Sequence, residues 1–305
     1  MELHSKGWQV FPMGLNKQMR IGISFNPYGH SYGRYGNQAY ARLKEHGYNA
    51  VDFNIADTNT ALYTLNQRDL KQTITAQRLA AQKAHVTISQ VHGPWRWPPQ
   101  DGTEAQRAER LEKMKKATVI TALLGCHHLV IHPIMPYGVE DGCCGKEQET
   151  WALNVAFFRE LADFAALYGV IICLENMPMH HFSLSTPQRI LELVTAIRHD
   201  HVRVCLDTGH VAVFPELSVG DEVRRLGDAI RVLHIHDNLG DRDSHLYPGD
   251  GRIDWADFGR ALEEVGYDGV LSLETQPSGA LDDRRFAEES IRLNRLFRAL
   301  LTDED

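Results

Sequence analysis

The sequence predicts a (β/α)₈ barrel, a ring of eight parallel strands enclosed by helices. One pattern recurs along the 305 residues: a short β-branched run, then a loop, then a longer stretch with helical spacing. Eight such units in a chain of this length match the barrel in number, order and size. No linker, repeat or low-complexity tract interrupts the pattern. We therefore expect one domain over residues 1–305, with residues 1–19 as an N-terminal extension.

The predicted strands are short runs rich in Val, Ile and Leu, which are typical of strands buried on both faces. In chain order they are RIGISF (20–25), AVDFNI (50–55), VTISQVH (86–92), HLVIH (128–132), VIICLE (170–175), VRVCLD (202–207), RVLHIH (231–236) and GVLSLE (269–274).

The predicted helices lie between these runs and space their apolar residues as one helical face. The clearest span residues 70–85, 104–124, 149–169, 185–199 and 283–301. The fourth has a good helix start, because Ser185 and Thr186 precede Pro187. A doubly wound open sheet is the alternative fold. It is disfavoured because the first strand leads into GISFNPYGHSYG (22–33), which is not a G-x-G-x-x-G phosphate turn.

The composition is that of a globular protein, with 43% apolar and 24% charged residues. No apolar run approaches the roughly 20 residues that cross a bilayer, and residues 1–20 lack the apolar core of a secretory signal. Five cysteines, an odd number, argue against a disulfide framework. We expect a cytoplasmic protein in a reducing compartment, with no membrane partner.

The charge of the chain argues against a nucleic-acid partner. The formal net charge is −8, and no extended Lys/Arg-rich run provides the basic surface that phosphate backbones require.

Titratable residues gather at the predicted carboxyl ends of the strands, where barrels of this class place their active sites. Six of the eight strands end in His, Asp or Glu. A lone residue of this kind is more often a satisfied core group or a salt-bridge partner than a ligand. Together, however, so many charges at one rim would repel unless a divalent cation neutralised them. These residues are His92, His132, Glu175, Asp207, His210, His234, Asp243, His245 and Glu274.

The same segments, taken in order, resemble the xylose-isomerase-like TIM-barrel superfamily. They are LEN (174–176), CLDTGH (205–210), HIHDN (234–238), D-x-H (243–245), PGDGRIDW (248–255) and LET (273–275). The resemblance covers nearly the whole chain from the first strand to the eighth. That group contains sugar isomerases, ketose 3-epimerases, inosose-processing enzymes and the family 2 apurinic-site endonucleases, so the resemblance implies the barrel and one of these activities.

The resemblance to the epimerases implies one divalent metal ion, bound by Glu175, Asp207, His234 and Glu274. Mn²⁺ or Zn²⁺ is expected ahead of Mg²⁺ or Co²⁺. The metal would bind adjacent oxygens of a ketose and stabilise an enediolate as a Lewis acid. Glu175 and Glu274 would then be the catalytic residues that remove and return a carbon-bound proton.

The apurinic-site endonucleases are the alternative, since their three-zinc site uses nine ligands whose types all occur here in matching order. Five of these ligands are not in the epimerase set: His92, His132, His210, Asp243 and His245. They are expected to be additional metal ligands or substrate contacts. Many isomerase-like relatives retain several of these positions, and the loops carry few cations. We therefore favour a small sugar substrate over a DNA phosphodiester.

The predicted loops after the first three strands are rich in aromatic residues. Trp95 is expected to contact the substrate, stacking with Trp97 on a sugar face or on a nucleobase, although a packed rim loop explains both equally well. His236 is expected to be a second substrate contact. Because it shares a predicted strand face with His234, it is also the residue most easily confused with His234 as the metal ligand. A metal-containing partner subunit without turnover is a third interpretation, disfavoured because both glutamates are intact. Assembly into a homo-oligomer stays open.

Overall fold

A computed structural model describes residues 20–302 and contains an eight-stranded parallel sheet. The strand order is β7-β6-β5-β4-β3-β2-β1-β8, and a parallel bridge between Ile235 and Leu273 joins its two ends. The sheet therefore closes into the predicted barrel rather than remaining open. The strands are β1 (Ile21–Phe25), β2 (Ala50–Asn54), β3 (Thr87–His92), β4 (His128–Ile131), β5 (Ile171–Glu175), β6 (Val202–Asp207), β7 (Ile230–His234) and β8 (Leu271–Leu273).

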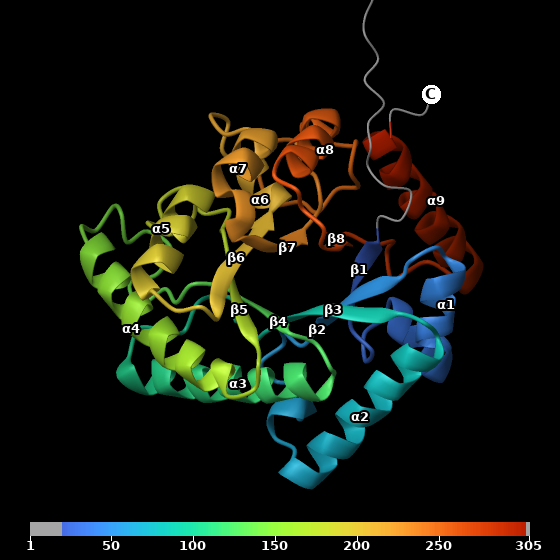
Figure 1. Ribbon diagram of the computed structural model, residues 1–305, viewed down its shortest axis with the longest axis horizontal. Coiled ribbons are helices and arrows are strands. Elements are labelled where there is room, and N and C mark those ends of the chain that lie inside the picture. Colours follow the sequence, from blue (N-terminus) through green and yellow to red (C-terminus); the bar gives the residue numbers. More distant parts are fainter. Residues whose placement is uncertain (1–19, 303–305) are drawn as a thin grey trace, which may run out of the picture.

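Helices follow the strands and surround the barrel (Figure 1). They are α1 (Ala39–Glu45), α2 (Gln67–Lys83), α3 (Glu104–Leu123), α4 (Glu147–Ala166), α5 (Pro187–Ile197), α6 (Thr208–Ala212), α7 (Val219–Leu226), α8 (Trp255–Glu264) and α9 (Asp283–Thr302). Short 3₁₀ turns are η1 (Tyr32–Gln38), η2 (Ala61–Tyr63) and η3 (Gly227–Ala229). No helix within residues 20–302 is both long and apolar enough to span a membrane.

The helix starts follow the local sequence. Thr186 caps α5 by accepting a hydrogen bond from the backbone N–H of Arg189, and Pro187 occupies the first turn as predicted. Thr103 and Gln106 form a capping box at the start of α3. The predicted extension, residues 1–19, lies outside the described residues.

The predicted strands agree with the structure to within two residues at each end, and two-residue differences occur at the start of β8 and at the end of β7. The sequence predicted strand up to His236, but β7 ends at His234. The reason is Thr208, whose hydroxyl accepts a hydrogen bond from His236 N at 3.1 Å and donates one to His236 O at 2.8 Å. A side chain thus satisfies backbone groups that a neighbouring strand would otherwise pair.

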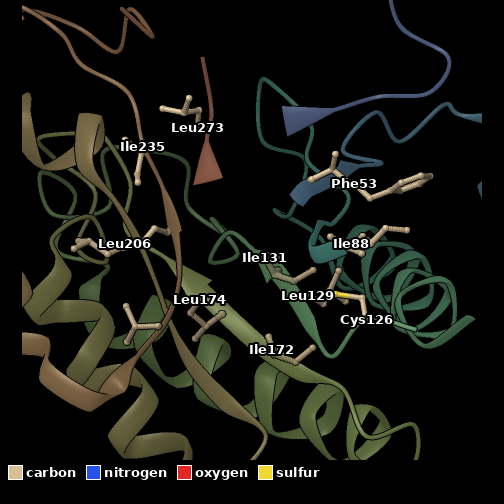
Figure 2. Close-up of a cluster of buried hydrophobic side chains, with 14 of the residues drawn as sticks. Phe53, Ile88, Cys126, Leu129, Ile131, Ile172, Leu174, Leu206, Ile235 and Leu273 are labelled. Carbon is tan, nitrogen blue, oxygen red and sulfur yellow. The ribbon is translucent and has the colours of Figure 1, made fainter. Parts of the chain in front are cut away.

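The main hydrophobic core lies between the strands and the helix layer. Figure 2 shows side chains from strand after strand in this cluster, among them Leu129, Ile172 and Leu206, which are fully buried. Burial of each such side chain contributes about 1.5–3 kcal/mol. The inside of the barrel holds a second, smaller cluster, formed by Val130, Cys173, Cys205 and Val232. The two cysteines are free and buried, so they act as small core residues.

Candidate metal site at the carboxyl end of the barrel

Four side chains at the carboxyl ends of β5, β6, β7 and β8 meet above the barrel interior. We call Glu175, Asp207, His234 and Glu274 the inner ligand group. One donor atom from each lies within 4.8 Å of all the others. His234 Nδ1 is 3.0 Å from Glu175 Oε1 and 3.1 Å from Glu274 Oε2. The barrel geometry therefore brings together residues that are up to about a hundred positions apart in sequence.

The inner ligand group has the composition of a divalent metal site. Three carboxylates and one imidazole meet at a point where Glu175, Asp207 and His234 are fully buried. Burial opposes ionisation of Glu175, but His234 and His132 outweigh it and hold the pKa of Glu175 well below its usual range. Oxygen and nitrogen donors of this type suit Mn²⁺, Zn²⁺, Co²⁺ and Mg²⁺, so the residues present fit such an ion.

Two more histidines extend the site from β3 and β4. His132 Nε2 lies 3.0 Å from Glu175 Oε2, and His92 Nε2 lies 3.9 Å from both Glu175 and Glu274. The ring of His92 stacks on that of His234 with centroids 5.4 Å apart. Together with Glu175, His92 and His234 make a second group that could hold a metal ion.

A further cluster lies beside Asp207. We call His210, His236, Asp243 and His245 the outer group. Asp243 Oδ2 is 3.3 Å from His210 Nε2 and 3.3 Å from His245 Nε2, while His236 Nε2 is 3.0 Å from Asp207 Oδ2. Burial lowers the pKa of His210, but Asp207 and Asp243 outweigh it and raise that pKa to about 10. All nine ligand positions expected from the endonuclease resemblance are therefore close together.

The outer group depends on close backbone packing at Gly209. A Cβ atom at this position would lie 1.9 Å from His236 Cε1, a distance that no side chain tolerates. Glycine in the CLDTGH segment thus lets α6 approach the imidazole that contacts Asp207.

The loop between β7 and α8 is anchored by Asp237, which is fully buried. Its carboxylate accepts hydrogen bonds from the backbone of Asn238, Gly249 and Ile253 and from Trp255 Nε1, at 2.9 to 3.3 Å. Asn238 also holds the loop, because its side chain donates to Gly209 O and accepts from Gly240 N. The PGDGRIDW segment therefore supports the loop that carries Asp243 and His245.

A cavity of about 400 Å³ opens over the metal site. Trp95 lines it and packs edge-on against His132, with centroids 4.5 Å apart. The ring of the exposed Trp97 lies 6.3 Å from that of Trp95, centroid to centroid. Among the described residues, the lining contains no Lys or Arg: Asn54, Ala56, His92, Trp95, Trp97, His132, Glu175, Met177, Pro178, Met179, His210, Asp243, His245 and Glu274.

His236 occupies a different place from the other predicted contacts. It is fully buried, contacts Asp207 and stacks on His245, and is not among the described residues that line the cavity. Its assignment as a substrate contact stays a prediction.

Sequence reasoning missed two residues that hold the site together. Asn176 bonds both backbone groups of Asp207 through its side chain, and its carbonyl lies 2.7 Å from His210 Nδ1. Asp52 of β2 places Oδ2 2.9 Å from His234 Nε2. A signal for Asp52 existed, since a carboxylate inside the apolar run AVDFNI must meet a polar partner.

Comparison with known proteins identifies the family of this chain and several of its relatives. Residues 40–296 match the family described as xylose isomerase-like TIM barrel. A D-psicose 3-epimerase of Ruminiclostridium cellulolyticum is 34% identical over 125 residues, 41% of each chain. This chain aligns with only about two fifths to two thirds of the length of the curated relatives it matches.

Two solved structures share the fold. The crystal structure of a D-psicose 3-epimerase in the presence of D-fructose superposes with a TM-score of 0.72 at 20% identity, covering 93% of this chain and 100% of that one. The crystal structure of the IOLI protein with a bound zinc atom has a TM-score of 0.69 at 20% identity, covering 93% and 99%.

Proposed function

We propose, from the premise that this chain belongs to the xylose isomerase-like TIM barrel family, that it is a divalent-metal-dependent epimerase or isomerase of a ketose or related sugar. One observation carries the proposal: the carboxylates of Glu175 and Glu274 approach the same nitrogen, His234 Nδ1, at 3.0 and 3.1 Å. Two carboxylates thus border one ligand point beneath the cavity. The D-psicose 3-epimerase relative supports this substrate class.

The two glutamates are suited to moving a proton at carbon. Both lie at the cavity, and neighbouring His234 counters burial so that the pKa of each carboxyl is lowered. Each is therefore an anion that can accept a proton from a carbon beside a carbonyl. Removal by one glutamate and return by the other inverts that carbon if the two act on opposite faces. A divalent cation in the inner ligand group would supply Lewis-acid polarisation of the carbonyl.

The remaining walls of the cavity suit an uncharged sugar. Trp95 and Trp97 offer apolar faces against which a sugar ring or chain can pack. The described lining has no Lys or Arg to pair with a phosphate, whereas its carboxylates and imidazoles can accept or donate hydrogen bonds to hydroxyls.

The first experiment measures exchange of substrate hydrogen with solvent. The metal-loaded protein is incubated in D₂O with a panel of ketoses, and deuterium in the recovered sugars is measured by mass spectrometry. We expect deuterium at the carbon that epimerises or isomerises. Glu274→Gln and Glu175→Gln should each lower turnover by about 10²- to 10⁴-fold, because the variant side chain cannot accept the proton.

Metal content is measured on every variant, because each glutamate is also a candidate ligand. Glu222→Gln is the matched control, since Glu222 is a buried glutamate of α7 whose carboxylate pairs with Arg225. It should keep full activity. Absence of exchange into any sugar by the metal-loaded wild-type protein would contradict the proposal.

A second function, zinc-dependent cleavage of a phosphodiester at an abasic site, is favoured by a separate observation. His92 and His132 approach Glu175, and His210 and His245 approach Asp243, so all nine ligand types of that mechanism converge. Clustered zinc ions could activate a hydroxide for such a reaction. About three zinc ions per chain, with cleavage of abasic DNA and no exchange into sugars, would establish this function in place of the first.

A further inference from the structure

Three of the site histidines share one pattern, and His234 departs from it. The Nδ1 atoms of His92, His210 and His245 lie 2.7 to 3.0 Å from backbone carbonyl oxygens. Nδ1 of each therefore carries the hydrogen, and Nε2 faces the carboxylates of the site. His234 is reversed: its Nδ1 faces the inner ligand group, and its Nε2 meets the carboxylate of Asp52 at 2.9 Å.

A carboxylate at the position of Asp52 is energetically unfavourable. It is only 1% exposed and lies on β2, which is separated from β7 by β8 and β1 in the closed ring. Within residues 20–302 its one ion pair is with His234, and its second oxygen, Oδ1, has no hydrogen-bond partner there. A buried carboxylate without an Arg or Lys partner destabilises a fold, so packing alone does not explain it.

We propose that Asp52 is a positioning residue that orients His234 as a metal ligand. By accepting the hydrogen of Nε2, the carboxylate fixes the ring so that the lone pair of Nδ1 points between Glu175 and Glu274. Its negative charge also makes the imidazole a stronger donor, as carboxylates behind metal-bound histidines generally do. This inference rests on the proposed metal site, and it adds a strand, β2, to the four that supply the ligands.

The geometry makes a specific alternative available when Asp52 is absent. Nδ1 of His234 lies 3.0 Å from Glu175 Oε1, so in the other tautomer it holds the hydrogen and donates it to that carboxylate. In that arrangement the nitrogen is blocked as a ligand. Asp52 disfavours it because Nε2 would then face a carboxylate without a hydrogen between them.

Metal affinity tests the proposal without measuring activity. Chelator-treated protein is titrated with Mn²⁺, and free Mn²⁺ is followed by electron paramagnetic resonance. Asp52→Asn keeps a neutral acceptor, whereas Asp52→Leu removes it. We expect affinity to fall in the order wild type, Asn variant, Leu variant, with a total loss of about 10- to 100-fold.

Asp141→Asn is the matched control. Asp141 is another fully buried carboxylate, but its hydrogen bonds go to the backbone and hydroxyl of Ser183, away from the inner ligand group. Its substitution should leave Mn²⁺ affinity unchanged. Folded Asp52 variants with wild-type affinity would overturn the proposal.

A spectroscopic measurement separates this inference from the proposed function. In metal-free, ¹⁵N-histidine-labelled protein, the Nε2 hydrogen of His234 should give a downfield signal that is protected from solvent exchange and is lost in Asp52→Leu. If the wild type binds no Mn²⁺ but shows this signal, the metal proposal fails and the positioning by Asp52 stands. If the wild type lacks the signal, the positioning role is wrong, and this result requires no variant to fold.

Discussion

At the scale of single residues, the inner ligand group shows why neighbouring histidines differ in chemistry. His234 and His236 are two positions apart and both fully buried, yet only His234 contacts Glu175 and Glu274. His236 contacts Asp207 instead, because Thr208 binds its backbone and ends the strand before it. A histidine's role here therefore depends on which carboxylate its ring reaches.

The first prediction concerns these ligands. Asp207→Ala or His234→Ala should strip the metal ion, because three remaining ligands leave the cation underbound and bury unpaired carboxylates. Elemental analysis of purified protein checks this, with metal per chain as the measured quantity. His236→Ala is the comparison and should lower metal content less. If both ligand variants kept full metal content, or if only the His236 variant lost it, the ligand assignment would be wrong.

At the scale of elements, the loop from β7 to α8 is ordered by a carboxylate that has no catalytic role in our proposal. Asp237 receives hydrogen bonds from both ends of the loop, including the indole of Trp255 at the start of α8. The loop in turn holds Asp243 between His210 and His245. Among the acidic residues of this segment, Asp237 thus anchors the loop, whereas Asp243 contacts two histidines.

The second prediction follows from that anchoring. Asp237→Ala leaves four hydrogen-bond donors without their acceptor, which should cost about 2–4 kcal/mol of unfolding free energy. Urea denaturation measures the loss as a shift of the midpoint. Asp241→Ala in the same loop is the control, since Asp241 is exposed. Equal stabilities of the two variants would show that Asp237 does not anchor the loop.

At the scale of the whole molecule, local patterns predicted the barrel and most of its site. Strand ends are readable from sequence because the carboxyl ends of parallel strands share one face of the barrel, which is why Glu175, Asp207 and Glu274 could be grouped. Asp52 could not be grouped with them. It lies in the middle of β2 rather than at its end, and its partner His234 is 182 positions away. Only the closed ring brings them into contact.

Closure of the ring is itself weakest beside the inner ligand group. The other neighbouring strands each pair over more than one residue, whereas β7 and β8 are joined by the single bridge between Ile235 and Leu273. Its hydrogen bonds run from Ile235 N to Ser272 O and from Glu274 N to Ile235 O, both 2.9 Å long. His234 and Glu274 stand on either side of this joint, so an ion held by both ties the two strands together.

The third prediction is that metal removal loosens this joint. A ligand at a hundred times its dissociation constant stabilises the folded state by about 2.7 kcal/mol. Chelation should therefore lower the melting temperature by roughly 5 °C in a protein of this size. Hydrogen exchange should also rise, most strongly at the amides of Ile235 and Glu274, because their bonds close the ring. The amide of Leu174, in the continuous β5 ladder, is the internal reference. Exchange that rises equally at the reference and at the joint would mean that the metal stabilises the fold without clamping the barrel.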